Sequence, residues 1–178
     1  MVSSTFQDLA KISIMGHPAV GKTTMLKLLT EDNYDPIYIP TQGFDLKSVK
    51  MRKFNLRVWD FGGQKAYLKY LEEYLEGSDL VFIVTDSTPR NVLNSKNLIK
   101  LAKKIVDNEC PVIAIANKQD LCKDDVSRMT PKLIEDLLDV KTYGLTAIMP
   151  SERKTLSEII KKELNQTLIR KRLKKNEL

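Results

Sequence analysis

The stretch GHPAVGKTT, from Gly16 to Thr24, has the residue types and spacing of a loop that closes around phosphate groups. It matches the pattern G-x-x-x-x-G-K-[ST] between an apolar segment and an amphipathic one, where such a loop joins a strand to a helix. Two glycines let the backbone turn its N–H groups toward phosphate oxygens, and the positive end of the following helix adds to the attraction. Lys22 is expected to reach the β- and γ-phosphates, and the Thr23 hydroxyl to bind Mg²⁺. The alternative is an ordinary glycine-containing turn with an exposed lysine.

All residues of this segment, called the phosphate loop below, are predicted to contact a nucleotide: Gly16, His17, Pro18, Ala19, Val20, Gly21, Lys22, Thr23 and Thr24. His17 is the only histidine in the chain. Its side chain is expected to point away from the phosphates, because the loop binds through backbone groups. Pro18 removes one N–H from the loop and places a rigid ring where the arginine of a partner protein would enter.

A second group of polar residues, NKQD at 117–120, follows the apolar run VIAIA. The carboxylate of Asp120 can accept hydrogen bonds from the N1–H and the exocyclic amine of guanine, whereas adenine presents no such pair on that edge. Asn117 is expected to bridge the base and the phosphate loop, and the aliphatic part of Lys118 to lie along the ring. Further contacts are expected at the end of the last strand and directly after it, at Thr146, Ala147 and Ile148. The Ala147 N–H is predicted to meet the guanine carbonyl oxygen, so that adenine would leave buried polar groups unmatched.

The segment RVWDFGGQ, which ends at Gln64, places a carboxylate, two glycines and an amide at the end of a strand. Asp60 is expected to end a strand beside the one that enters the phosphate loop, and to hold Mg²⁺ directly or through water. Gly63 offers its N–H to a γ-phosphate, and Gln64 can orient the attacking water. Thr41 supplies a second anchor, with its hydroxyl on the metal and its N–H on the γ-phosphate. A polar glycine-rich turn without a ligand is the alternative.

These residues together predict an enzyme site that hydrolyses GTP to GDP with Mg²⁺ as cofactor. The metal ligands would be Thr23, Thr41 and Asp60, and the catalytic residues Gln64, Lys22 and Thr41. Two charge-assisted hydrogen bonds to the γ-phosphate contribute about 3–6 kcal/mol, and about 5.5 kcal/mol shifts a two-state equilibrium from 1:99 to 99:1. We therefore expect Asp32–Gln42 and Asp60–Tyr74 to act as switch loops that order with GTP and recruit effectors. Hydrolysis should be slow alone, since an arginine supplied by a partner is worth about 10³–10⁵ in rate.

The order of apolar and amphipathic segments predicts an α/β fold in a single domain, with helices on both faces of the sheet. Strands are expected at Lys11–Met15, Phe44–Met51, Phe54–Trp59, Leu80–Thr85, Val112–Ala116 and Thr142–Thr146. Helices are expected at Lys22–Leu29, Tyr67–Leu75, Val92–Asn108, Pro131–Leu138 and Thr155–Leu173. Because only two residues separate the second and third strands, these form a hairpin. The sheet is thus six-stranded and mostly parallel, with one antiparallel edge strand.

Most of the net charge of +6 belongs to the C-terminal part of the chain. The segment 161–178 holds seven basic and two acidic residues and therefore carries +5. A nucleic-acid partner is not expected, because the remaining body is nearly neutral. Weak, salt-sensitive contact of this tail with an anionic membrane is an alternative to a solvated helix end. No run of about 18 apolar residues predicts a membrane span, and Cys110 and Cys122 are expected to be reduced thiols of a cytoplasmic protein.

Five stretches, GHPAVGKTT, IPTQGF, VWDFGGQ, NKQD and TAI, occur in the order and spacing of the Ras superfamily. PTQGFD and VWDFGGQ make the chain most similar to the Arf and Arf-like branch, over about residues 12–164. The resemblance implies a P-loop NTPase G domain of the small GTPase type at 1–164, followed by a basic C-terminal extension at 165–178. It also implies effector-binding residues at Phe44, Trp59 and Tyr74. Expected partners are effectors, exchange factors and GTPase-activating proteins, and we expect a monomer.

The sequence also departs from the Arf pattern. Residue 2 is Val rather than Gly and no cysteine lies near the C-terminus, so no lipid anchor is expected. The protein is then expected in the cytoplasm, or peripherally at the cytosolic surface of a membrane. WDFGGQ also resembles the Roc domains of larger proteins, which leaves a stand-alone Roc-like G domain as an alternative. A GTP-bound adaptor that does not hydrolyse its nucleotide is another.

Overall fold

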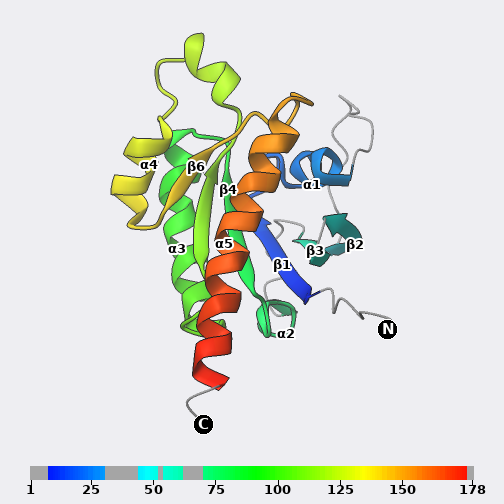
Figure 1. The fold of residues 1–178 in the computed structure, drawn as a ribbon. Coiled ribbons are helices and arrows are strands. Elements are labelled where there is room, and N and C mark those ends of the chain that lie inside the picture. Colours follow the sequence, from blue (N-terminus) through cyan, green and yellow to red (C-terminus); the bar gives the residue numbers. More distant parts are fainter. Residues whose placement is uncertain (1–7, 31–43, 52–53, 62–69, 176–178) are drawn as a thin grey trace.

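A computed structural model describes residues 8–30, 44–51, 54–61 and 70–175 of the chain (Figure 1). The strands of this part are β1 (Asp8–Gly16), β2 (Phe44–Met51), β3 (Phe54–Phe61), β4 (Leu80–Thr85), β5 (Val112–Ala116) and β6 (Thr142–Gly144). Its helices are α1 (Lys22–Thr30), α2 (Leu71–Leu75), α3 (Pro89–Ile105), the short 3₁₀ helix η2 (Gln119–Lys123), α4 (Pro131–Leu138) and α5 (Glu152–Lys175).

The strands form one sheet in the order β2-β3-β1-β4-β5-β6. Strand β2 lies at an edge and runs antiparallel to β3, with Met51 opposite Phe54 at the predicted hairpin. Every other neighbouring pair is parallel. The predicted six-stranded, mostly parallel sheet with an antiparallel edge strand is therefore confirmed.

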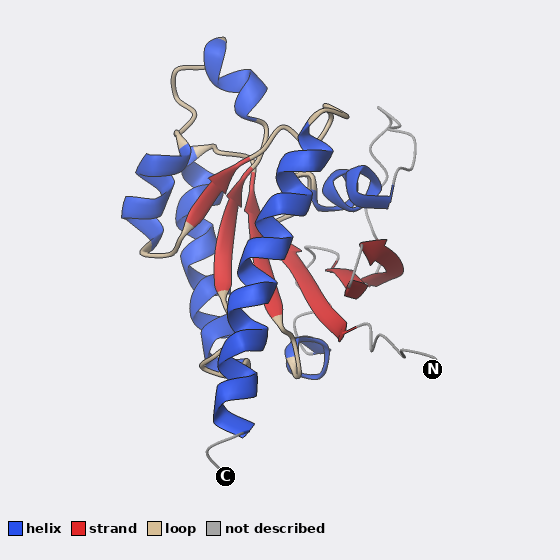
Figure 2. Cartoon of the chain, viewed as in Figure 1, coloured by secondary structure: helices blue, strands red, loops and turns tan. Residues whose placement is uncertain are grey.

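Two apolar layers hold helices against opposite faces of the sheet (Figure 2). On one face, α1 and α5 pack against alternating strand residues such as Ile12 and Phe82. On the other face, α2, α3 and α4 pack against the intervening ones, such as Val81 and Ile83. Strands β4 and β5 are buried on both faces, which explains why they are continuous apolar runs rather than alternating ones.

The parallel strands end at one edge of the sheet, and the loops that follow them gather there. From β1 the chain proceeds to β3 on one side and to β4 on the other, so the direction of the strand order reverses at β1. Open α/β sheets bind ligands outside the carboxyl ends of their strands at such a reversal. The phosphate loop begins at Gly16, the last residue of β1, and therefore lies at the position where a ligand is expected.

Several element boundaries differ from the sequence prediction. Strand β1 is Asp8–Gly16 rather than Lys11–Met15, β3 ends at Phe61 rather than Trp59, and α1 ends at Thr30 rather than Leu29. Helix α3 begins at Pro89 and ends at Ile105, not at Val92 and Asn108, because proline fits the first turn of a helix while the apolar periodicity starts only at Val92. Strand β6 ends at Gly144 rather than Thr146, so Thr146 lies in the loop that follows. The beginning predicted for the second helix, Tyr67, lies outside the described residues.

Helix α5 begins at Glu152, three residues before the predicted Thr155, and continues to Lys175. It passes through the predicted boundary between 164 and 165 without a break. In Figure 1 the end of α5 points away from the loops at the carboxyl ends of the strands. Within the described part of the chain, no helix has both the length and the apolar character needed to cross a membrane.

Candidate functional site

The phosphate loop joins β1 to α1 through backbone conformations that suit glycine. Gly21 has a φ of +101°, and Ala19 also adopts a positive φ, of +63°. A Cβ at Gly16 would lie 2.3 Å from the carbonyl oxygen of Val84 on the neighbouring strand. Any side chain at Gly16 would therefore push the loop away from the edge of the sheet.

Lys22 and Lys118 both extend their ammonium groups to carbonyls of this loop. The buried Lys22 donates from Nζ to the carbonyl oxygen of His17, at 3.0 Å. Lys118 Nζ donates to the carbonyl oxygen of Ala19, at 2.7 Å. Two cationic side chains thus flank the loop, one from its own helix and one from the NKQD segment, which favours an anionic ligand.

Asn117 connects the phosphate loop to the loop after β6. Its side chain is 2% exposed, and Nδ2 donates to the carbonyl oxygen of Val20 at 2.9 Å. Its Oδ1 accepts from the Ala147 N–H at 3.0 Å. The predicted bridge from Asn117 to the phosphate loop is therefore present. A Cβ at Gly21 would lie only 2.2 Å from Asn117 Nδ2, so this glycine is what allows the approach.

The residues predicted to bind the base lie around this bridge. Asp120 is half-buried, and its carboxylate has no hydrogen-bond or ion-pair partner within the described residues. Thr146 is buried, whereas Ile148 is 46% exposed. The Ala147 amide, which we predicted for a guanine oxygen, instead donates to Asn117 in this structure. Its role toward a base stays a prediction, and a base oxygen would have to share or replace that bond.

His17 and Pro18 lie on the outer part of the phosphate loop. The Nε2 atom of His17 is buried and has no hydrogen-bond partner within the described residues. Pro18 is exposed, as is Ala19 beside it. The orientation of His17 relative to phosphates stays a prediction, and so does the interference of the Pro18 ring with a partner's arginine.

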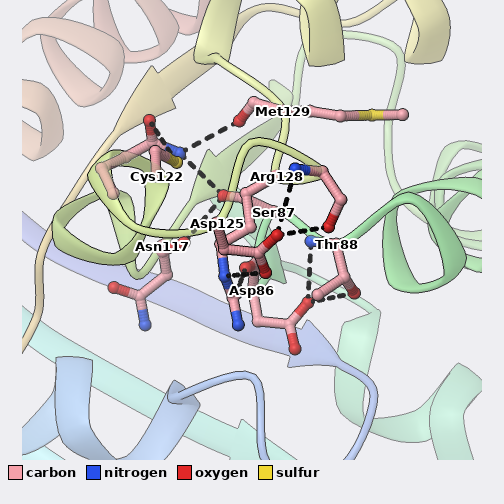
Figure 3. A network of polar contacts seen from close by, with 10 residues as sticks. Asp86, Ser87, Thr88, Asn117, Cys122, Asp125, Arg128 and Met129 are labelled. Carbon is pink, nitrogen blue, oxygen red and sulfur yellow. Dashed lines mark hydrogen bonds and ion pairs between the residues drawn. The ribbon is translucent and has the colours of Figure 1, made fainter.

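Sequence reasoning missed a network that holds the NKQD segment in place (Figure 3). Ser87, two residues after β4, donates from its hydroxyl to the carbonyl oxygen of Asn117 at 2.8 Å. The Met129 N–H donates to the carbonyl oxygen of Ser87, and Arg128 Nη1 donates to that of Asp86 at 2.6 Å. Gln119 of NKQD belongs to this network through bonds to Ser87 and Met129. These partners come from two other loops, so no local sequence pattern predicts the network.

The carboxylate of Asp86 stabilises the turn after β4. It accepts hydrogen bonds from both the amide and the hydroxyl of Thr88, at 3.1 and 2.7 Å. Burial alone would raise the pKa of Asp86, but the hydrogen bonds from Thr88 and Asn91, with the nearby charge of Lys118, outweigh it and lower that pKa. Asp86 therefore stays ionised next to the cationic groups of the site.

The predicted metal and switch residues are only partly within the described structure. In the backbone register, Asp60 pairs with Ile14 of β1 and with Asp45 of β2, so β3 ends beside the strand that enters the phosphate loop, as predicted. Thr23 is half-buried in the first turn of α1. A threonine hydroxyl, as at position 23, and an aspartate carboxylate, as at position 60, are oxygen ligands of the kind that Mg²⁺ prefers. Thr41, Gly63, Gln64, Asp32–Gln42 and 62–69 of the second switch loop lie outside the described residues.

For two of the predicted effector residues, Phe44 and Trp59, the structure gives the backbone position, and for Tyr74 it also gives the side-chain contacts. Phe44 begins β2, and Trp59 pairs in register with Ser13 and Leu46. Tyr74 is half-buried on α2 against the core, and its ring centroid lies 6.3 Å from that of Tyr70. Desolvation, with the nearby Glu73 and Tyr70, raises the pKa of Tyr74. Their role in effector binding stays a prediction.

The chain is similar in sequence to one protein family and to several of its characterised members. The model of the ADP-ribosylation factor family matches residues 1–169. ADP-ribosylation factor-like protein 3 of Caenorhabditis elegans is 36% identical over 143 residues, which is 77% of this chain and 76% of that protein. The protein of the same description from Chlamydomonas reinhardtii is 39% identical over 114 residues, 63% of this chain and 64% of its own length. The latter match thus spans less than two thirds of that relative.

A solved structure supports the fold independently. The Arl6 BBS3 small GTPase from Trypanosoma brucei, solved with the bound nucleotide analogue GppNp, superposes with a TM-score of 0.72 at 17% identity. The superposition covers 90% of this chain and 99% of the other. At this identity the likeness concerns the fold alone.

Proposed function

This chain belongs to the ADP-ribosylation factor family of small GTPases, and we propose that it is a molecular switch that binds GTP and hydrolyses it slowly to GDP. The bridge made by Asn117 is the observation that carries the proposal. Its amide joins the phosphate loop to the loop after β6, and NKQD lies almost a hundred residues from the phosphate loop in the sequence. A phosphate cradle and a base-binding segment thus share one buried side chain, as a nucleotide that spans both requires.

The preference for guanine rests on Asp120. Its carboxylate follows directly on the bridge, is half-buried and accepts no hydrogen bond within the described residues. A carboxylate in that position pairs with two adjacent N–H donors, which guanine presents and adenine does not. Leaving such a group unpaired in a buried site is costly, and this cost is the source of discrimination.

Mg²⁺ would be held by Thr23, Thr41 and Asp60 and would neutralise charge on the phosphates when bound. Lys22 supplies a further positive charge at the phosphate loop, and Gln64 would orient the attacking water. The γ-phosphate would anchor the two switch loops through Thr41 and Gly63. Effectors, exchange factors and GTPase-activating proteins would then distinguish the GTP-bound from the GDP-bound form.

The test begins with the nucleotide that the purified protein carries. Denaturing the protein and separating the released nucleotides by ion-exchange chromatography should yield GDP or GTP. Competition of GTP and ATP against a fluorescent guanine nucleotide should show a preference for GTP of at least about a thousandfold. Adenine nucleotide in the extract, together with equal competition by ATP, would overturn the proposal.

Hydrolysis separates the switch from the non-hydrolysing adaptor. In single-turnover reactions the wild type should convert bound GTP to GDP measurably, and Gln64→Leu should be slower by at least about tenfold. If both proteins remain equally inert over hours, the adaptor alternative is correct. The Roc-like alternative gains no support from the comparisons, which match the ADP-ribosylation factor family.

Location and membrane contact stay predictions from the sequence. Helix α5 carries the backbone of the basic segment as far as Lys175. We propose a cytoplasmic protein whose basic end has weak, salt-sensitive affinity for anionic lipid, worth about 1 kcal/mol per basic residue near the surface.

A further inference from the structure

We propose that Gln119 is a positioning residue for guanine recognition, which fixes Asp120 relative to the rest of the base site without touching the nucleotide itself. The inference rests on the proposed function, because it concerns the same site. Gln119 is the first residue of η2 and directly precedes Asp120. The residue before it, Lys118, has a left-handed backbone, with φ 61° and ψ 38°. Such a conformation is strained for a residue other than glycine, so it persists only where surrounding contacts hold it.

The carboxamide of Gln119 uses both of its donor hydrogens. Nε2 donates to the hydroxyl of Ser87 at 2.7 Å and to the carbonyl oxygen of Met129 at 3.3 Å. The Ser87 hydroxyl in turn donates its single hydrogen to the carbonyl oxygen of Asn117. Because each hydrogen takes part in one bond, the donors follow one direction along this chain of hydrogen bonds, from Gln119 to Ser87 and from Ser87 to Asn117.

The two partners of Gln119 are themselves immobilised. Ser87 is fully buried and has a positive φ of 67°, so its position depends on its contacts. Met129 donates from its N–H to the carbonyl oxygen of Ser87 at 2.8 Å (Figure 3). Arg128 anchors the same segment through Asp86 and through an ion pair with Asp125 at 3.2 Å. The segment before α4 is thus fixed to the end of β4, and Gln119 is held by both.

The stem of Gln119 contacts the third loop of the site. A Cβ at Gly144 would lie 3.6 Å from Gln119 Cγ and 2.8 Å from Pro131 Cγ, so both side chains cover this glycine at the end of β6. The Gln119 N–H also donates to the carbonyl oxygen of Leu145, at 3.3 Å. One residue therefore contacts the loops after β4 and β6 and the segment before α4. Asp120 follows it in the chain, so its carboxylate is set relative to Ala147 through these contacts.

Two substitutions separate the hydrogen bonds from the packing. Gln119→Glu keeps the shape of the side chain but replaces the donor with a carboxylate, which would face the Met129 carbonyl and compete for the Ser87 hydrogen. Gln119→Met keeps a stem of similar length over Gly144 but has no donor. Gln166→Glu is the matched control, because Gln166 is exposed on α5 and the substitution makes the same change of charge.

The readout is the ratio of affinities for GDP and for IDP, the inosine nucleotide that lacks the exocyclic amine. Displacement of Asp120 should weaken the two-bond contact with guanine more than the one-bond contact with hypoxanthine. We expect the preference for GDP over IDP to fall by about fivefold or more in Gln119→Glu and in Gln119→Met. We also expect GDP release to accelerate by about tenfold in both, and the control to match wild type. Thermal unfolding of each protein measures any loss of stability separately.

The outcomes are distinct. A variant that melts earlier but keeps the wild-type ratio of GDP to IDP affinity would show a merely structural role and overturn the inference. If Gln119→Glu does not fold, the ratio in Gln119→Met decides the question. A wild-type protein that binds GDP no better than ADP would overturn the proposed function itself. A wild type with strong GDP preference and unchanged ratios in the variants would overturn only the role of Gln119.

Discussion

The two ends of strand β6 each meet a buried polar network, and the two networks differ in kind. At the carboxyl end, the loop at Ala147 joins Asn117, whose bonds are made by a neutral amide and backbone groups. At the amino end, the carboxylate of Glu163 on α5, 3% exposed, accepts from Lys141 Nζ at 2.5 Å and from the Tyr143 hydroxyl at 2.6 Å. The Asn117 network joins loops, whereas the Glu163 network joins helix α5 to strand β6 and the residue before it.

Under the proposed function, the two networks divide nucleotide binding and stability between the two ends of β6. The Glu163 network ties α5 to the sheet, and the neighbouring Thr142 N–H donates to Glu135 of α4 at 2.9 Å. It uses a charged group, because a buried carboxylate with strong donors fixes geometry without any ligand. The Asn117 network leaves Asp120, three residues further on, without a hydrogen-bond or ion-pair partner among the described residues, and its carboxylate therefore has capacity for a ligand. Substitutions at the carboxyl end of β6 should mainly change nucleotide binding, and those at the amino end should change stability alone.

The largest effect is expected for Gly21→Ala. The new Cβ would lie 2.2 Å from Asn117 Nδ2, and the φ of +101° disfavours any side chain. Asn117 would have to leave Val20 and Ala147, so we expect GDP affinity to fall by about 100-fold, since two lost buried hydrogen bonds are worth about 3 kcal/mol. Titration with a fluorescent guanine nucleotide measures this.

Gly77→Ala is the control for the glycine substitution. Gly77 also has a positive φ, of +70°, but no atom of the described residues lies within 4 Å of a Cβ there. It should lose about 1 kcal/mol of stability from backbone strain and keep its GDP affinity. If both alanine variants bound GDP equally well, the phosphate loop would not depend on the Asn117 contact, and the contrast between the two ends of β6 would weaken.

A smaller effect, on stability only, is expected for Glu163→Gln. The amide oxygen can still accept from Lys141 and Tyr143, but both bonds lose the negative charge on the acceptor, so the free energy of unfolding should fall by about 1–2 kcal/mol. Urea denaturation measures this change, with the exposed Glu158→Gln on the same helix as control. GDP affinity should not change, and a loss of more than about threefold would show that the networks are coupled.

The same comparison should depend on pH in a defined direction. Burial works to lower the pKa of Lys141, but the bonds to Glu163 and Tyr143 raise it overall; burial and Glu163 also raise the pKa of Tyr143. For both groups the folded state holds the proton more tightly than the unfolded state. Their contribution is complete below the unfolded pKa values, about 10, and is lost as the pH rises through the folded values. The stability difference between wild type and Glu163→Gln should therefore shrink above about pH 10.

The sequence predicts most of the fold because its signals are local. Strands β2, β4 and β5 and helix α4 have the predicted bounds. Helix α4 shows why, since Thr130 caps it through its hydroxyl and Pro131 occupies its first turn. The contact between Asn117 and the phosphate loop was predicted as well, because two motifs with known spacing imply a shared ligand.

The rest depends on side chains that meet only in three dimensions. No pattern in the sequence pairs Gln119 with Ser87 and Met129, which come from different loops. The bond between the Ala147 amide and Asn117 likewise involves the loop after β6, which begins beyond Gly144, whereas the predicted strand continued to Thr146. Boundaries of this kind are set by tertiary contacts that outweigh local propensity.

The smallest expected effect, and the only gain, comes from Thr85→Val at the end of β4. Thr85 is fully buried, and its hydroxyl has no hydrogen-bond partner within the described residues. Valine has nearly the same shape without the unpaired polar group, so the free energy of unfolding should rise by about 1 kcal/mol and Tm by about 2–4 °C. Thr167→Val is the control, because the equally buried Thr167 donates to the Glu163 carbonyl at 3.0 Å and should be destabilised by the same change. Thermal unfolding of the nucleotide-free and GDP-bound forms would show more. A Thr85→Val protein that is destabilised only with GDP bound would mean that this hydroxyl belongs to the binding network at the carboxyl end of the sheet.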